Sequence, residues 1–325
     1  MSQSAKSQSA TPQSILVSLD GTVLDPEIPF LHADDLAAVR GDGIFETLLI
    51  RDGWARCVTL HLQRLARSAE MLDLPEPDAE KWRSAIEVAT RTWVDCNGES
   101  AEGLLRLVYS RGREAHPAGA GVESGVPTAY LTVGPVAERV VAVRANGVSV
   151  ITLDRGYSID VADAAPWQLL GAKTLSYATN MAALRHAADN GYDDVIYVSS
   201  EGAILEGPRS TVVAVMGKTL VTPPAEIGIL PGTTQVATFA LAAEEGWQTE
   251  TRVLRPADLL EADSVWLISS VTLAARVTAL NGHRLPVAEV CQDFVDLVDR
   301  AISSDRQWSV SAGSPRGHQR DPAHK

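Results

Sequence analysis

The chain has few of the residues that mark secreted, membrane or metal-binding proteins. Its three cysteines, Cys57, Cys96 and Cys291, are an odd number without a CxxC pair, which favours reduced thiols in the cytoplasm. It contains no run of about 18 apolar residues, which argues against a membrane-spanning helix. The first ten residues have no apolar stretch of the kind found in a secretory signal. The seven histidines show no HxxxH spacing, and we expect no metal site.

Positive charge is also scarce. Against 41 acidic side chains stand 28 basic ones, a net charge of −13, so nucleic acid and anionic membranes are poor candidates for the main partner. An anionic small-molecule substrate would have to be attracted by local arginines. With 45% apolar residues, a chain of 325 residues can form one large domain or two ordinary ones.

Strand patterns and helical spacing alternate through most of the chain, which predicts an α/β and α+β architecture. Strands are predicted at 15–19, 44–50, 104–109, 129–133, 148–153, 195–198, 211–215 and 264–268. Helices are predicted at 58–72, 77–93, 177–190, 233–245 and 288–302. The weakly patterned segment 135–146 separates the two halves of this series.

Two domains are therefore expected. Residues 14–136 would form a small N-terminal α/β domain, residues 137–146 an interdomain linker, and residues 147–303 a larger C-terminal domain that binds a cofactor. The polar ends, residues 1–13 and 304–325, have little to bury and are predicted to be disordered tails.

Lys173 and Glu206 together suggest a site for pyridoxal phosphate. Lys173 is flanked by Leu169, Leu170 and Leu175, and apolar surroundings lower the pKa of a lysine and free its amine to form a Schiff base. Glu206 follows 33 residues later in an Ile-Leu-Glu-Gly turn, where its carboxylate could hold a proton on a pyridine nitrogen. Either residue alone is more often an ordinary surface or turn residue. Their order and separation match the two needs of this cofactor.

Four further residues are candidates to bind a phosphate. Thr233 and Thr234 follow Leu-Pro-Gly and open a predicted helix, whose first N–H groups and positive dipole end suit an anion. Simple N-capping is the alternative. Ser270 ends an apolar strand and could add a hydroxyl. Arg64 borders the apolar face of the helix predicted at 58–72 and could clamp phosphate, although a surface arginine has the same appearance.

Arg106 is a charged residue inside the apolar strand predicted at 104–109. A charge in that position needs a partner or a ligand, which makes Arg106 a candidate to bind a substrate carboxylate. Arg111, five residues later, could add a second positive charge.

The segment 15–25 offers a competing interpretation. It is similar to the strand and DxDGT start of haloacid-dehalogenase-type phosphatases, whose first aspartate is the nucleophile. Ser18 occupies that position here and cannot supply the acyl-phosphate chemistry or a Mg²⁺ ligand. A hairpin turn at Asp20 and Gly21 explains the segment better.

Six landmarks occur in a fixed order along the chain. They are Gly41-Asp-Gly-Ile-Phe-Glu-Thr47, His61-Leu-Gln-Arg64, Lys173 with its following helix, Glu206-Gly207, Leu230-Pro-Gly-Thr-Thr234 and Ser269-Ser270. With them, the chain from about residue 15 to 302 resembles the fold-type IV pyridoxal-phosphate enzymes, also called the class IV aminotransferase family. That family includes branched-chain and D-amino-acid aminotransferases and 4-amino-4-deoxychorismate lyase.

The resemblance implies a role for each matched residue. Lys173 would be the imine lysine and proton shuttle, and Glu206 would face the pyridine nitrogen. Phosphate binding falls to Arg64, Thr233, Thr234 and Ser270, while Tyr177 would lie near the cofactor ring, and Phe45 and Thr47 would line the substrate pocket. One departure is Arg209-Ser210-Thr211, where the family often has Ser-Asn or Glu-Asn after Glu-Gly.

The resemblance also narrows the reaction. Thr47 and the stretch 105–112 resemble the lyase branch, so the expected reaction is 4-amino-4-deoxychorismate to 4-aminobenzoate and pyruvate, a folate-precursor step. The alternative is an aminotransferase of D-amino or branched-chain amino acids, and a non-catalytic binding protein on the same fold is a further alternative. By analogy with the fold, we expect a homodimer.

Overall fold

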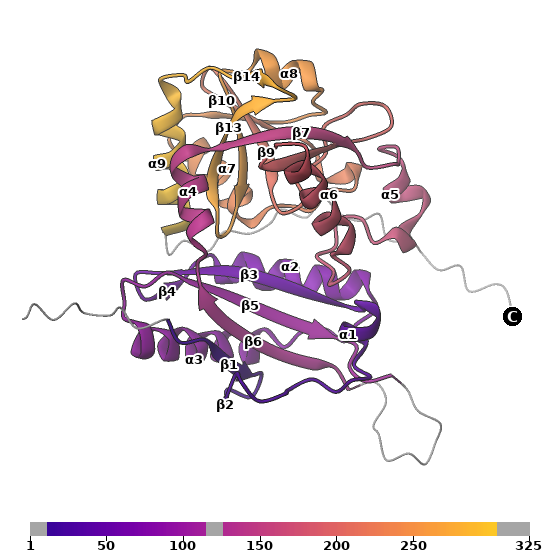
Figure 1. The fold of residues 1–325 in the computed structure, drawn as a ribbon, viewed down its shortest axis with the longest axis vertical. Helices are drawn as coiled ribbons and strands as arrows, with labels where there is room; N and C mark the ends of the chain where they lie inside the picture. The colour runs from indigo at the N-terminus through magenta and orange to yellow at the C-terminus, as the bar shows by residue number, and fades with distance from the viewer. Residues whose placement is uncertain (1–11, 115–125, 304–325) are drawn as a thin grey trace, which may run out of the picture.

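A computed structural model describes residues 12–114 and 126–303 of the chain. Two β-sheets, each with its own helices, lie one above the other (Figure 1). The strands of the first sheet fall between Ile15 and Pro135, and those of the second between Val148 and Arg284.

The first sheet has six antiparallel strands in the order β2-β1-β6-β5-β3-β4. Its strands are β1 (Ile15–Ser18), β2 (Val23–Leu24), β3 (Gly43–Arg51), β4 (Trp54–Ala55), β5 (Gly103–Ser110) and β6 (Thr128–Pro135). Its helices are α1 (Leu36–Arg40), α2 (Val58–Met71) and α3 (Ala79–Asn97). The strands and helices predicted in this half are confirmed to within four residues at each end.

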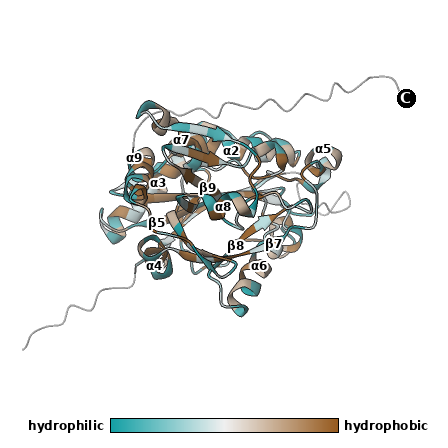
Figure 2. Cartoon of the chain, turned by 90° about the horizontal axis from the view of Figure 1, so that it is seen from above, coloured by the Kyte–Doolittle hydropathy of each residue, from teal (hydrophilic) through white to brown (hydrophobic). Residues whose placement is uncertain are grey.

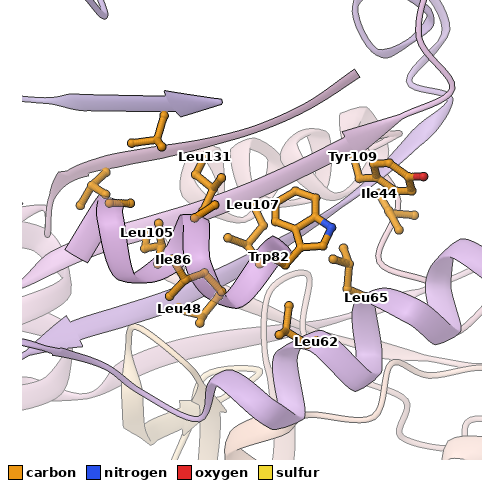
Figure 3. Packing of buried hydrophobic residues seen from close by; sticks show 14 of the residues in the cluster. Ile44, Leu48, Leu62, Leu65, Trp82, Ile86, Leu105, Leu107, Tyr109 and Leu131 are labelled. Atoms are coloured by element: carbon orange, nitrogen blue, oxygen red, sulfur yellow. The ribbon is translucent and has the colours of Figure 1, made fainter. Parts of the chain in front are cut away.

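One face of the first sheet packs against α2 and α3 through an apolar core (Figure 3). Because side chains alternate along a strand, Ile44 and Leu48 of β3 share this face with Leu105 and Leu107 of β5. Trp82 of α3 is completely buried among them, and truncating such a tryptophan to alanine costs about 3–5 kcal/mol. The core holds α2 flat against β3, and the opposite face of the sheet is free to line a site.

Helix α4 (Glu138–Asn146) connects the two sheets, where the sequence predicted a linker at 137–146. Val140 is the buried residue of this helix. Arg144 donates hydrogen bonds to the Glu102 carboxylate on one side and to the Val271 carbonyl on the other. The connection is therefore an ordered helix whose bonds reach both sheets.

The second sheet is mixed and follows the order β11-β10-β9-β12-β13-β7-β8, with β14 paired to β13. Its strands are β7 (Val148–Asp154), β8 (Asp194–Val198), β9 (Thr211–Met216), β10 (Thr219–Thr222), β11 (Gln248–Thr251), β12 (Ser264–Ser269), β13 (Leu273–Leu280) and β14 (His283–Arg284). The strands predicted at 148–153, 195–198, 211–215 and 264–268 are confirmed.

In the part of the chain that the structure describes, five α-helices accompany the second sheet. They are α5 (Val161–Ala164), α6 (Ala178–Asp189), α7 (Thr233–Glu244), α8 (Pro256–Glu261) and α9 (Val290–Ser303), and the predictions at 177–190, 233–245 and 288–302 are confirmed. Phe294 of α9 is fully buried, with its ring 4.9 Å from that of Trp266. Figure 2 shows hydrophobic residues gathered in the central strands, such as β9, and hydrophilic ones along the outer helices. The fold class predicted from the sequence is confirmed.

The segment around Asp20 is a hairpin, as predicted. Strands β1 and β2 pair antiparallel, with Val17 opposite Val23. Asp20 accepts hydrogen bonds from the Ser18 hydroxyl and the Thr22 amide, and Gly21 has a φ of 86° that suits glycine. The side chain of Asp20 thus closes a turn.

Within residues 12–114 and 126–303, none of the helices combines the length and apolar character needed to cross a membrane. The tails predicted to be disordered, 1–13 and 304–325, lie almost entirely outside the described residues.

Candidate active site

A cavity of about 1130 Å³ is lined by residues of both sheets and the segments between them. Ten of the eleven candidate residues from the sequence line it: Phe45, Thr47, Arg64, Arg106, Lys173, Tyr177, Glu206, Thr233, Thr234 and Ser270. Lys173 and Glu206 therefore line the same cavity.

The backbone around Lys173 docks onto the first sheet. The Lys173 carbonyl accepts a hydrogen bond from the Phe45 amide at 3.0 Å, and the Lys173 amide donates to the Ser68 hydroxyl of α2 at 3.1 Å. A Cβ added to Gly43 would come within 2.8 Å of both Leu175 and Ser110, so glycine permits the close approach. The first sheet and α2 therefore fix the backbone at Lys173.

The side chain of Lys173 is held between aromatic rings. Its Nζ lies 4.5 Å from the centre of the Phe45 ring and 5.9 Å from that of Tyr177. Burial, and then the positive charge of Arg64, lower the pKa of the Lys173 amine to about 8. A larger share of this amine is neutral at physiological pH than for an exposed lysine.

Glu206 lies in the segment between β8 and β9. Its Oε2 accepts a hydrogen bond from the Leu230 amide at 3.0 Å, and its Oε1 lies 3.8 Å from Nη1 of Arg155. Arg155 in turn stacks on the ring of Tyr197, 4.3 Å from its centre. Burial raises the pKa of Glu206 to about 7, although Arg155 and the Leu230 amide oppose the rise.

The raised pKa of Glu206 predicts a pH dependence of the free energy of unfolding in the apoenzyme. Between pH 4.5 and 7 the folded state binds more protons at this group than the unfolded state, so the contribution of Glu206 to stability is full below pH 4.5 and is lost as the pH rises through 7. Relative to Glu206→Gln, the wild-type apoenzyme should lose up to about 3 kcal/mol across this window. Urea denaturation of both proteins at several pH values measures this, and parallel curves would contradict it.

A set of hydrogen-bond donors lies at the start of α7. Thr233 and Thr234 are the first residues of the helix and are almost fully buried, and the N-cap, Gly232, has no side chain to bond their amides. The Thr233 and Ser270 hydroxyls are 3.1 Å apart. Arg64 reaches the same region, and its Nη1 donates to the Pro231 carbonyl at 2.9 Å. Hydroxyls, a guanidinium and a helix N-terminus are a donor set suited to phosphate.

Arg106 lies on the face of the first sheet opposite to the apolar core. It is cross-strand to Thr47, and its guanidinium carbon is 5.8 Å from the centre of the Phe45 ring. The side chain is exposed to the cavity. Arg111, by contrast, is bound by Asp42 through two hydrogen bonds and by the Leu72 carbonyl, and it lies outside the cavity lining. The expectation that it joins Arg106 is therefore wrong for this structure.

Tyr177 contributes its ring to the cavity, but its hydroxyl is engaged by the protein. The hydroxyl donates to the Pro208 carbonyl at 2.5 Å, and the ring packs edge-on against Phe45 with centroids 5.4 Å apart. The ring of Tyr177 therefore lines the cavity next to Lys173.

Three residues at the site had no role in the sequence interpretation: Arg155 beside Glu206, and Glu46 and His61 beside Arg64. Arg155 comes two residues after the strand predicted at 148–153, a position that gave no signal. Glu46 and His61 stand inside quoted landmarks, and a glutamate within an apolar strand was a signal that could have been used.

Comparison of the chain with known proteins agrees with the arrangement of the cavity residues. The family model of amino-transferase class IV matches residues 43–280. The chain belongs to the class IV aminotransferase family. The resemblance found in the sequence is confirmed, and the match spans more than half of the chain.

Several relatives cover nearly the whole chain. It is 54% identical over 299 residues to the bifunctional aminodeoxychorismate lyase / D-amino acid transaminase of Mycobacterium tuberculosis. The aligned region covers 90% of this chain and 100% of the relative. A hypothetical aminotransferase from M. tuberculosis, solved in a PLP-bound form and in a form with α-ketoglutarate and PMP, is 55% identical over the same shares, with TM-scores of 0.86 and 0.85. A fold IV transaminase from Curtobacterium pusillum is 40% identical, covers 88% of this chain and 98% of its own, and has a TM-score of 0.81.

Proposed function

We propose that the chain is a pyridoxal-phosphate-dependent lyase that converts 4-amino-4-deoxychorismate into 4-aminobenzoate and pyruvate. The observation that carries the proposal is the convergence of Lys173 and Glu206 on one cavity beside a set of phosphate donors. The 54% identical relative, which is named for this lyase activity, supports the choice of reaction.

The residues of the cavity fit the cofactor. Arg64, Thr233, Thr234 and Ser270 offer N–H and O–H groups to its phosphate at the start of α7. Lys173 would hold its aldehyde, and Glu206 would hold the proton on its pyridine nitrogen. When bound, pyridoxal phosphate supplies the electron sink for negative charge at the substrate carbon that carries the amine.

Lys173 is also the proposed proton-transfer residue. A pKa of about 8 puts its amine close to the operating pH, where a general base is most effective. Removal of the proton from the amine-bearing carbon drives the break of the C–O bond to pyruvate, and the remaining ring becomes aromatic. The two products together contain all the atoms of the substrate. We assign Arg106, beside Phe45 and Thr47, to a substrate carboxylate.

A second activity, transamination of D-amino acids, is favoured by two observations. The 54% identical relative is named for both activities, and the 55% identical aminotransferase was solved with α-ketoglutarate and PMP. Both reactions would begin with the same proton transfer by Lys173. They would differ afterwards, because only a substrate that carries a leaving group can undergo elimination.

Product analysis separates the two reactions. Purified protein with 4-amino-4-deoxychorismate and no keto acid should release 4-aminobenzoate, detected by its fluorescence, and an equal amount of pyruvate. D-Alanine with 2-oxoglutarate should give pyruvate and glutamate, and L-leucine with 2-oxoglutarate tests the branched-chain alternative. The lyase proposal would be rejected if 4-aminobenzoate forms only when a keto acid is added, or if no 4-aminobenzoate forms under either condition.

A further inference from the structure

A buried ionic network lies beneath the phosphate donors. Its centre is Glu46, which belongs to β3 and shares the core face of that strand with Ile44 and Leu48. The side chain of Glu46 is completely buried, and an ionised carboxylate without partners is very costly there. The partners that Glu46 does have, His61 and Arg64, both come from α2.

Glu46 binds the guanidinium of Arg64 along one edge. Nε donates to Oε1 and Nη2 donates to Oε2, both at 2.7 Å. With the bond from Nη1 to the Pro231 carbonyl, three of the five N–H groups of Arg64 are in use. The remaining two, one on each terminal nitrogen, have no hydrogen-bond partner among the described residues and are available to a ligand of the cavity.

Glu46 also binds His61. The Nδ1 of His61 lies 2.7 Å from Oε2 of Glu46, and its Nε2 lies 3.3 Å from the Thr233 hydroxyl and 3.2 Å from the Ser270 hydroxyl. Burial would raise the pKa of Glu46, yet the charges and hydrogen bonds of Arg64 and His61 outweigh it and keep that pKa well below its usual range. Nδ1 therefore donates to an ionised carboxylate, and Nε2 is turned toward the two hydroxyls.

We propose that Glu46 and His61 are positioning residues for the phosphate of the cofactor. Glu46 fixes the guanidinium of Arg64 directly and fixes the Thr233 and Ser270 hydroxyls through His61, so one carboxylate orients the phosphate donors contributed by α2, α7 and the end of β12. This inference rests on the proposed pyridoxal-phosphate function. Neither residue touches the reacting atoms, so both act by way of the groups they orient.

The charge balance of the cluster favours an anionic ligand. Arg64 and the protonated fraction of Lys173 bring positive charge to the cavity, and Glu46 compensates only part of it. Glu46 uses the edge of Arg64 formed by Nε and Nη2, which leaves hydrogens on both terminal nitrogens. A network built only for stability would have no need to turn two hydroxyls and a helix N-terminus toward the same cavity.

The test compares apoenzyme binding of pyridoxal phosphate with that of pyridoxal, which lacks the phosphate. In Glu46→Gln the ratio of the two affinities should fall about tenfold or more, because hydrogen bonds to charged groups are worth about that much. Affinity for pyridoxal should change less than twofold. The matched control is Glu245→Gln, which removes the glutamate of another two-bond pair, with Arg300, far from the cavity, and should leave the ratio unchanged.

Two further measurements keep the inference testable if Glu46→Gln folds poorly. In His61→Gln the Arg64 pair is intact, and the affinity ratio should fall about threefold because only the hydroxyls are released. The ³¹P resonance of bound cofactor should be independent of pH between about 6 and 8 in the wild type and should titrate in folded Glu46→Gln. Wild-type protein that fails to bind pyridoxal phosphate would overturn the proposed function. Wild-type binding together with an unchanged affinity ratio and ³¹P profile in the folded variants would overturn only this inference.

Discussion

Replacing Lys173 with alanine is expected to lower turnover by about 10⁴-fold or more. The substitution removes the amine that would hold the cofactor aldehyde and, with it, the general base, which alone contributes about 10²–10⁴-fold. At pH 7.5, a pKa of about 8 leaves about a quarter of the Lys173 amines neutral, whereas an ordinary lysine would leave about one in a thousand. This tuning depends on burial and on Arg64, which an amine elsewhere on the chain would lack.

Borohydride reduction followed by peptide mapping tests the same assignment independently of activity. The chain has five lysines, at positions 6, 81, 173, 218 and 325, so the modified peptide identifies the residue. Lys218→Ala, in the exposed turn between β9 and β10, is the matched control and should retain full turnover. A phosphopyridoxyl group found on another lysine, or Lys173→Ala with turnover within tenfold of wild type, would disprove the assignment.

The sequence could predict the site because its residues lie in short motifs with recognisable chemistry. Lys173 has apolar neighbours, and Glu206 stands in a tight turn after a strand. Thr233 opens a helix after Pro-Gly, and α7 begins at that residue. These signals are local, and the fold then brings the motifs together across distances that no local pattern encodes.

Strand β13 shows where local pattern fails. Leu273–Leu280 reads Leu-Ala-Ala-Arg-Val-Thr-Ala-Leu, and its alanines, leucines and arginine are good helix formers, so no strand was predicted. It is nevertheless a strand, because it pairs antiparallel with β12 and parallel with β7 in the middle of the second sheet. Partners on both sides satisfy its backbone and override the propensity of its side chains.

Strand β11 and helix α4 were missed for other reasons. All four residues of Gln248–Thr251 are exposed, so the strand carries no apolar alternation and is recognisable only by its pairing with β10. In α4 only Val140 is buried, which gives the segment a weak apolar face. Short elements that bury little leave little trace in a sequence.

The site residues that the sequence did not reveal share one property: each contacts another residue of the site. Arg106 attracted notice as a charge in an apolar strand, and the same argument applies to Glu46, which lies in β3 between Ile44 and Leu48. The sequence could not show that Glu46 faces His61 and Arg64, since that depends on the packing of α2 against the sheet. Arg155 likewise acquires its meaning only from the position of Glu206.

Replacing Glu206 with glutamine is expected to lower turnover by about 10²–10³-fold while the cofactor stays bound. Glutamine has a similar shape and can still accept the hydrogen bond from the Leu230 amide, but it cannot carry the negative charge that keeps a proton on the pyridine nitrogen. Loss of one preorganised electrostatic group of this kind costs about that factor. Cofactor affinity should change little, because the phosphate donors and Lys173 lie elsewhere in the cavity.

A cofactor analogue with a carbon atom in place of the ring nitrogen turns this into a double-mutant cycle. The wild type with the analogue should be about as slow as Glu206→Gln with pyridoxal phosphate, and combining the two changes should bring little further loss, because both remove the same interaction. Glu201→Gln, which changes an exposed residue earlier in the same segment between β8 and β9, is the control and should turn over normally. Additive losses would mean that Glu206 acts through Arg155 and the local fold, and an undiminished rate in Glu206→Gln would remove the carboxylate from the mechanism altogether.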